Sequence, residues 1–106
     1  MAKNVAEQLV DTLEKAGVKR IYAVTGDSLN EVNEAVRKSG KIKWIHVRHE
    51  ETGAFAAAAE AQLNGELACC AGSSGPGHVH LINGLYDAQR SGAPVLAIAS
   101  TLPTHE

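Results

Sequence analysis

The sequence predicts an α/β protein built on a three-layer, doubly wound parallel sheet. Segments with helical spacing of apolar residues alternate four times with short β-branched or apolar runs along the 106 residues. This order implies right-handed crossovers between parallel strands and helices on both faces of the sheet. The length suits one domain, residues 1–106, and leaves no room for a second.

The spacing of apolar residues and the positions of turn residues give approximate bounds for each element. Helices are predicted over 5–16, 28–39, 50–63 and 78–90, and strands over 20–24, 41–47, 66–71 and 95–99. Residues 102–106 follow the last strand and have no predicted partner.

The first two helices have clear local signals. Apolar residues recur at intervals of three, four and one over 5–16, and Gly17 supplies a stop. The compact β-branched and aromatic run 20–24 then predicts a strand. Ser28 and Glu31 have the Ser-x-x-Glu spacing of a capping box, so the second helix is expected to start at Ser28.

The third helix is mostly alanine. It follows the strand 41–47 and runs from Glu50, with Phe55 among the alanines, to the stop at Asn64-Gly65. A helix that is apolar on nearly every side must be covered by its own sheet or by another chain. We therefore expect a homo-oligomer that associates through this helix.

The remaining elements surround a glycine-rich loop. The third strand, 66–71, leads into Gly72-Ser73-Ser74-Gly75-Pro76-Gly77, where the backbone can approach a ligand closely. The helix 78–90 has an apolar stripe, and the turn 91–94 leads to the last strand.

Cys69 and Cys70 are neighbours in a predicted strand, so their side chains are expected on opposite faces. This placement prevents an easy disulfide and favours small buried apolar residues in a reducing compartment.

Composition excludes several classes of function. The net charge of −2 is spread without runs, and only four residues are Phe, Trp or Tyr, so a nucleic-acid surface is not expected. No apolar run reaches membrane-spanning length, and Glu7 interrupts any signal peptide. These features predict a soluble cytoplasmic protein.

Three strand-to-helix loops are expected at one edge of the sheet, because all carboxyl ends of parallel strands lie there. They are 25–28, 48–50 and 72–77, and they place the carboxylate of Glu50 in a cleft. Glu50 and Glu51 also suit a first helical turn simply because the helix dipole favours acids there, so both interpretations stay open.

Familiar motifs do not fit the glycine loop. The third glycine of a dinucleotide-binding Gly-x-Gly-x-x-Gly is replaced by His80, and the lysine of a phosphate-binding P-loop is missing. Ser74 lacks the glycine that a nucleophile elbow needs two residues later. His78 and His80 point to different sides of a helix, so no metal site is predicted. Arg48 and His49 are placed to pair with Glu51 or with backbone carbonyls, and for Arg48 and Glu51 we expect such ordinary structural contacts.

Several motifs occur together in register. They are Val24-Thr25-Gly26-Asp27-Ser28-Leu29-Asn30, Arg48-His49-Glu50-Glu51, the glycine loop, and residues 16–22, 56–60 and 80–88. With these motifs the chain resembles the N-terminal part of thiamine-diphosphate enzymes of the pyruvate oxidase, acetolactate synthase and pyruvate decarboxylase superfamily. It is most similar to the pyruvate oxidase or pyruvate dehydrogenase (quinone) type.

The resemblance implies a pyrimidine-binding (PYR) domain in which Glu50 activates thiamine diphosphate. Such a glutamate hydrogen-bonds the pyrimidine N1′ and favours the tautomer whose 4′ nitrogen takes the thiazolium C2 proton. The activated cofactor then attacks a 2-oxo acid such as pyruvate, and carbon dioxide leaves.

The resemblance also implies roles for other residues. Gly26, Asp27 and Ser28 match the loop near the substrate, with Gly26 also contributing to the cofactor site. The turn and helix that line the cofactor cleft match Gly75, Pro76, Gly77 and Asn83.

The chain departs from the family in length. Family members are several times longer, so it corresponds to one truncated PYR domain over 1–106. Magnesium and FAD are expected only through diphosphate-binding and middle domains that this chain lacks. Two interpretations follow: a catalytic half-site that works with partner chains, or a non-catalytic module derived from such an enzyme.

Overall fold

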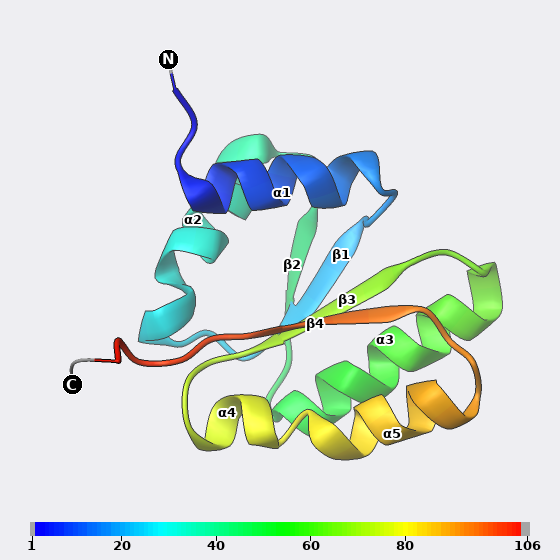
Figure 1. Cartoon of the computed structure of the whole chain (residues 1–106). Helices are drawn as coiled ribbons and strands as arrows, with labels where there is room; N and C mark the ends of the chain where they lie inside the picture. The colour runs from blue at the N-terminus through cyan, green and yellow to red at the C-terminus, as the bar shows by residue number, and fades with distance from the viewer. Residues whose placement is uncertain (1, 105–106) are drawn as a thin grey trace.

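The computed structural model describes residues 2–104 and shows a sheet between two layers of helices (Figure 1). The helices are α1 (Val5–Lys15), α2 (Asn30–Ser39), α3 (Glu50–Asn64), α4 (Pro76–Val79) and α5 (Ile82–Arg90), with a short 3-10 helix, η1 (Asp27–Leu29). The strands are β1 (Arg20–Ala23), β2 (Lys43–His46), β3 (Ala68–Gly72) and β4 (Val95–Ala99). Of the predicted partnerless segment 102–106, residues 105 and 106 lie outside the described part.

All neighbouring strands are parallel, in the order β2-β1-β3-β4, which confirms the predicted fold class. Tyr22 of β1 pairs with Ile45 of β2 on one side and with Cys70 of β3 on the other. The connection from β2 to β3 therefore crosses β1, and the winding reverses between β1 and β3. Open α/β sheets bind ligands outside the carboxyl ends of their strands at such a switch point.

Each face of the sheet has its own apolar core. α1 and α2 cover one face, where Leu13, Ile21 and Val36 are buried together. α3 and α5 cover the other face, where Ala57 and Leu81 are buried. The predicted three layers are therefore present.

Cys69 and Cys70 lie on opposite faces of β3, as the sequence predicted. Cys69 belongs to the core beneath α1 and α2, and Cys70 to the core beneath α3 and α5. Both are free thiols, and burial raises the pKa of each to about 12. They therefore stay protonated at neutral pH and act as small apolar residues.

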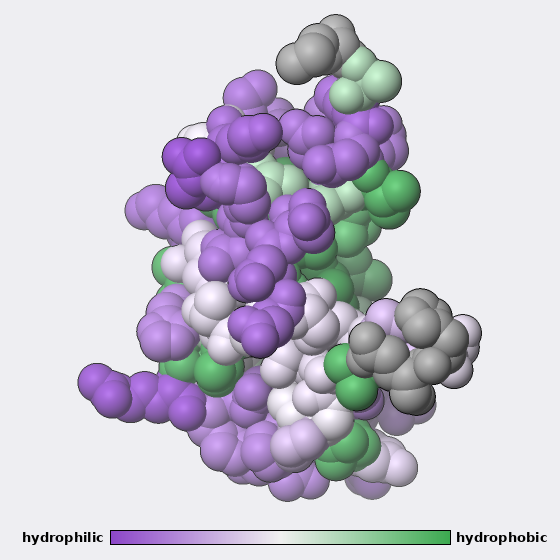
Figure 2. All heavy atoms as spheres, turned by 90° about the vertical axis from the view of Figure 1, so that its left-hand side faces the viewer, coloured by the Kyte–Doolittle hydropathy of each residue, from purple (hydrophilic) through white to green (hydrophobic). Residues whose placement is uncertain are grey.

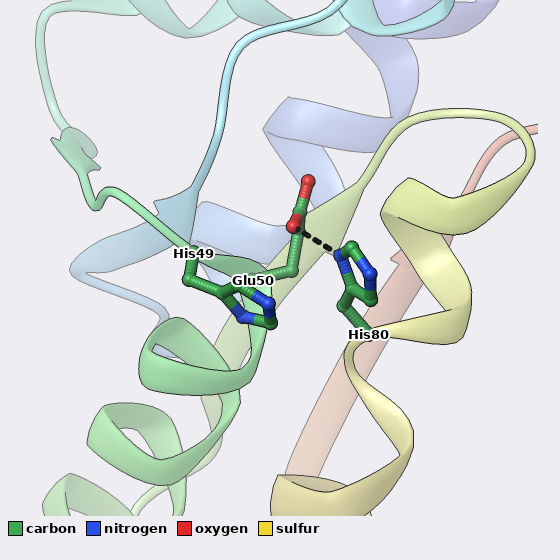
Figure 3. A group of neighbouring side chains, drawn as sticks. All are labelled: His49, Glu50 and His80. Carbon is green, nitrogen blue, oxygen red and sulfur yellow. Dashed lines mark hydrogen bonds and ion pairs between the residues drawn. The ribbon is translucent and has the colours of Figure 1, made fainter.

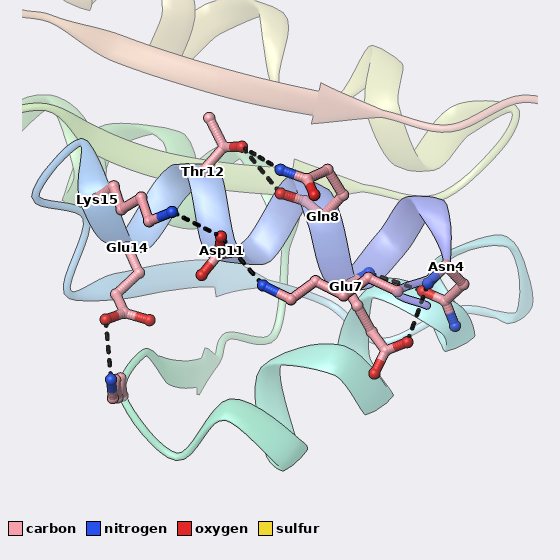
Figure 4. A network of polar contacts seen from close by, with 9 residues as sticks. Asn4, Glu7, Gln8, Asp11, Thr12, Glu14 and Lys15 are labelled. Carbon is pink, nitrogen blue, oxygen red and sulfur yellow. Dashed lines mark hydrogen bonds and ion pairs between the residues drawn. The ribbon is translucent and has the colours of Figure 1, made fainter. Parts of the chain in front are cut away.

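α1 begins with a capping box (Figure 4). The Asn4 side chain accepts a hydrogen bond from the backbone N–H of Glu7, and the Glu7 carboxylate accepts one from the backbone N–H of Asn4. Farther along, Lys15 and Lys3 flank Asp11 and lower the pKa of its carboxyl group. The capping box marks where the helix begins, and the ion pairs of Asp11, which lie at the surface, contribute little to stability.

The predicted capping box between Ser28 and Glu31 is wrong. η1 occupies this position, and α2 begins only at Asn30 without a side-chain capping bond. The Ser28 Oγ instead lies 2.6 Å from the Ser100 Oγ and accepts a hydrogen bond from the Ser74 backbone N–H at 3.0 Å. The Ser28 hydroxyl thus hydrogen-bonds two segments that are distant in the sequence, and it does not cap α2.

The predicted helix 78–90 is also wrong as a single element, because it is divided into α4 and α5. His80 and Leu81 keep right-handed helical dihedrals, so the chain does not reverse there. The break is local: the Leu81 N–H donates to the His78 carbonyl oxygen, three residues earlier. It leaves Leu81 buried in the core and His80 facing α3.

α3 packs closely against α5 at Gly84. A Cβ atom on Gly84 would clash with the Cβ of Ala54 and lie 2.8 Å from the Ala54 carbonyl carbon. The outer side of α3 remains uncovered, since Phe55 is 41% and Leu63 is 89% exposed. Within residues 2–104, no helix is both long and apolar enough to cross a membrane.

Candidate functional site

The loops after β1 and β3 meet at the carboxyl edge of the sheet, as the sequence predicted. A Cβ atom on Gly26 would lie 2.5 Å from the Cβ of Ser73, so the two loops are in contact. Figure 2 views the molecule from this side: hydrophilic side chains dominate the upper half, and residues of intermediate hydropathy fill the lower centre. The contact between Gly26 and Ser73 therefore joins the loops that follow β1 and β3, the two strands of the switch point.

Glu50 is the first residue of α3 and, among the described residues, the one charged residue that is buried, with the residue as a whole 8% exposed. Its Oε1 lies 3.0 Å from the His80 Nδ1 (Figure 3). No described protein group hydrogen-bonds its Oε2, and a Cβ atom on Gly77 would lie 3.4 Å from this oxygen. One carboxylate oxygen is thus fixed by the protein, and the other faces the glycine loop.

His80 is the site residue that the sequence analysis missed. It comes from the C-terminal end of α4 and reaches Glu50 across 30 positions of sequence. Its helical spacing relative to His78 was visible in the sequence, but its contact with Glu50 was not. The sequence carried no signal that could have paired the two residues.

His49 makes structural contacts on both sides of Glu50. Its Nδ1 accepts a hydrogen bond from the Glu51 backbone N–H at 3.1 Å and so caps α3. Its ring also stacks on His80, with centroids 4.4 Å apart and planes inclined by 28°. His49 therefore supports both neighbours of Glu50, the helix start and the His80 ring.

Asn83 and Glu51 are joined to each other. The Asn83 Nδ2 donates to the Glu51 Oε2 at 3.0 Å, which ties the first turn of α5 to the first turn of α3. Glu51 thus makes the ordinary structural contact expected of it. The Asn83 side chain thus lies next to the residue that follows Glu50, with its amide nitrogen already paired.

The glycine loop is tightly folded, and one of its residues, Gly77, lies next to Glu50. A Cβ atom on Gly72 would lie 2.7 Å from the His78 Cα, and one on Gly77 would lie 2.7 Å from the Ser73 Oγ. Gly75 has a φ of +71°, a left-handed conformation that favours glycine, and Pro76 opens α4. The absence of side chains at Gly72 and Gly77 therefore lets the loop fold tightly on itself, and Gly77 also lies next to the Glu50 carboxylate.

Asp27 and Ser28, in the loop after β1, have different environments. Asp27 is exposed at the start of η1. Ser28 is held by Ser74 and Ser100, and the His78 Nδ1 lies 3.0 Å from the Ser100 carbonyl oxygen. Ser100, which the sequence did not single out, thus connects the ends of β1, β3 and β4.

Three curated proteins illustrate what this chain is similar to. An uncharacterized 42.6 kDa protein in the isoamylase 3′ region of Pseudomonas amyloderamosa is 63% identical over 102 residues, which cover 96% of this chain and 26% of that protein. Pyruvate oxidase of Lactiplantibacillus plantarum is 45% identical over 97 residues, 91% of this chain and 16% of the oxidase. Acetolactate synthase 3, chloroplastic, of Brassica napus is 37% identical over 98 residues, 92% of this chain and 15% of the synthase.

The chain spans 15% to 26% of the lengths of these relatives. The family described as thiamine pyrophosphate enzyme, N-terminal TPP binding domain, matches residues 3–106. This match includes all three loops at the carboxyl edge and confirms the resemblance seen in the sequence motifs. The chain therefore belongs to the family of N-terminal thiamine pyrophosphate (thiamine diphosphate) binding domains of thiamine pyrophosphate enzymes.

Proposed function

We propose that this chain is the pyrimidine-binding half of a thiamine-diphosphate-dependent enzyme that decarboxylates a 2-oxo acid, and that Glu50 activates the cofactor. The observation that carries the proposal is the Glu50 carboxylate, which is buried at the switch point with Oε2 facing the glycine loop. Oxidative decarboxylation of pyruvate is our first choice, because pyruvate oxidase is the more similar of the two named enzymes.

The residues present fit the pyrimidine end of the cofactor. A carboxylate oxygen without a protein partner can accept a hydrogen bond from a ring nitrogen. The missing side chain at Gly77 leaves room next to Oε2, because even one added carbon would lie 3.4 Å from it. The loops beside Glu50 contain Gly26, Gly75 and Pro76. We assign these residues to the cofactor site together with Gly77 and Asn83. We assign Asp27 and Ser28 to the substrate side.

When bound, thiamine diphosphate supplies the nucleophilic carbon and the electron sink for decarboxylation. The protein's part is to hold a carboxylate at the pyrimidine N1′. His80 occupies Oε1 and so orients Oε2, and the α3 N-terminus stabilises the negative charge. Burial beside alanines lowers the local dielectric constant, which strengthens the hydrogen bond to a ligand.

A second candidate is a non-catalytic module in which Glu50 only occupies a first helical turn. The observation in its favour is that Glu51, its neighbour in the same turn, has a purely structural partner in Asn83. In either case we assign the binding of magnesium and FAD to parts of a full-length enzyme outside this chain, which spans 16% of the similar pyruvate oxidase.

The chain by itself should bind thiamine diphosphate weakly and should not decarboxylate pyruvate. One carboxylate hydrogen bond, backbone contacts and a small apolar area leave about 4 kcal/mol after the loss of translational freedom, which corresponds to a dissociation constant of about 1 mM. The measurement is an NMR titration of the ¹⁵N-labelled chain with thiamine diphosphate and magnesium. Shifts should gather at Glu50 and the glycine loop and should disappear in Glu50→Gln.

Two outcomes of this titration would contradict the proposal. One is shifts scattered away from the carboxyl edge, and the other is unchanged binding in Glu50→Gln. Pyruvate turnover by the chain without a diphosphate-binding partner would show that the half-site does more than we propose.

We also propose that the chain self-associates through α3 and the adjacent α5. Phe55, Ile82, Leu63 and Tyr86 are large apolar or aromatic residues of these helices and are 41%, 47%, 89% and 63% exposed. Sedimentation equilibrium should show dimers or larger species at high concentration, and Phe55→Ser with Leu63→Ser should shift the equilibrium toward monomer. Val5→Ser, at an 87% exposed position of α1, is the matched control. A strictly monomeric chain would rule out this surface.

A further inference from the structure

Three ligand-type side chains converge at the start of α3. One ring nitrogen each from His49 and His80 and one Glu50 carboxylate oxygen lie within 4.8 Å of one another. Both imidazole rings lie beside the carboxylate in Figure 3. We propose that these three residues form a binding site for a zinc-type divalent cation.

No metal site is predicted from the sequence, because His78 and His80 point to different sides of a helix. The structure separates that pair: the His78 Nδ1 lies 3.0 Å from the Ser100 carbonyl oxygen, whereas the His80 Nδ1 lies 3.0 Å from the Glu50 Oε1. The second imidazole comes instead from His49, 31 positions before His80 in the sequence. The cluster therefore exists only in the folded chain.

The donor set selects the class of cation. Two imidazole nitrogens and one carboxylate oxygen form a ligand set that zinc enzymes use, with a fourth position left for water. Mg²⁺ and Ca²⁺ favour sites with six or more oxygen ligands, which this cluster does not provide. We therefore assign Zn²⁺, or a cation with similar preferences, and expect no Mg²⁺ at this position.

Small side-chain rotations bring the donors to bonding distance. Zn²⁺ bonds of about 2.0–2.2 Å place tetrahedral ligand atoms roughly 3.3–3.6 Å apart, and the three donors already lie within 4.8 Å of one another. The His80 side chain is 42% exposed, so it can rotate and a cation can enter from solvent. The Glu50 carboxylate, at 11% exposure, is the fixed member.

Binding replaces contacts that already exist, and this limits the affinity. The His49 Nδ1 now accepts the Glu51 N–H, and the His80 Nδ1 contacts the Glu50 Oε1. Cation binding has to break at least one of these two hydrogen bonds. We therefore expect weaker binding than at a dedicated structural zinc site. The cation also shares Glu50 with the proposed cofactor, so the two should compete.

The test is calorimetric titration of the chain with ZnCl₂ and separately with MgCl₂, in the absence of thiamine diphosphate. One Zn²⁺ should bind per chain, and Mg²⁺ should give no binding at the same concentration. His49→Asn, which keeps an acceptor for the Glu51 N–H, and His80→Gln should each weaken Zn²⁺ binding about tenfold or more. His46→Asn, at an exposed position of β2, should leave it unchanged.

A second readout uses the unaltered chain. In ¹H–¹⁵N spectra of the imidazole rings, Zn²⁺ should shift the signals of His49 and His80 and leave those of His46 and His78 in place. Buried Cys69 and Cys70 are not expected to compete for the cation. Absence of Zn²⁺ binding, or binding that leaves the His49 and His80 rings unaffected, would overturn the site. Because no cofactor is present, this result is independent of whether the proposed cofactor function is correct.

Discussion

Glu50→Gln should abolish exchange of the cofactor's C2 proton in a full-length enzyme that carries this chain as its N-terminal domain. Glutamine keeps the size of the side chain but replaces one carboxylate oxygen by an amide, so the charge that should hold the pyrimidine N1′ is lost. General acid–base contributions of this kind are worth about 10²–10⁴ in rate. The measurement is proton–deuterium exchange at C2, followed by NMR after acid quenching.

Glu51→Gln is the matched control for this variant. Glu51 lies in the same first turn of α3, and glutamine still offers an oxygen to the Asn83 amide. Exchange in Glu51→Gln should stay near that of the unaltered enzyme, and both variants should keep the far-UV circular dichroism of the parent. Normal exchange in Glu50→Gln would remove Glu50 from the mechanism and favour the purely structural role of a first-turn acid.

Gly84→Ala should lower the free energy of unfolding by about 1–3 kcal/mol, the usual cost of overpacking a core. Its new Cβ would clash with the Ala54 Cβ and lie 2.8 Å from both the Ala54 carbonyl carbon and the Phe55 backbone nitrogen. Backbone atoms cannot rotate away, so α5 must move off α3. The helix propensity of alanine favours the variant by up to about 1 kcal/mol and offsets only part of this cost. Urea unfolding measures the difference.

Two comparisons separate the clash from other effects of Gly84→Ala. Gln89→Ala changes an exposed residue of the same helix and should alter stability by less than about 0.5 kcal/mol. Adding Ala54→Gly to Gly84→Ala removes the clash between the two Cβ atoms, so the double variant should show a favourable coupling in a double-mutant cycle. Unchanged stability of Gly84→Ala would show that α3 and α5 are not packed as closely as the structure indicates.

Much of the fold could be predicted from the sequence, because helices and strands leave local patterns. The strand Val95–Ala99 and the start of α3 at Glu50 agree with the prediction, since flanking turn residues and a change of periodicity mark both. The parallel sheet followed from the alternation of elements. Opposite placement of Cys69 and Cys70 followed from the period of two along a strand.

The two wrong predictions have the same physical origin. Ser28 had a local capping partner in Glu31, but its hydroxyl binds Ser74 and Ser100 instead. These residues lie 46 and 72 positions away in the sequence, so local spacing cannot predict the contacts. The predicted helix 78–90 had a continuous apolar stripe, yet it is divided between α4 and α5. In both cases contacts with distant segments prevailed over a local preference worth only about 1 kcal/mol.

The candidate site divides in the same way. The position of Glu50 at the start of a helix that follows a strand, and the glycine-rich loop elsewhere in the chain, are visible in the linear sequence, because they are properties of neighbouring residues. The burial of this carboxylate, the contact of His80 with Oε1 and the orientation of Oε2 toward Gly77 appear only when the chain is folded. Burial and hydrogen-bond partners depend on which segments the sheet brings together, and the residues involved lie about 30 positions apart in the sequence.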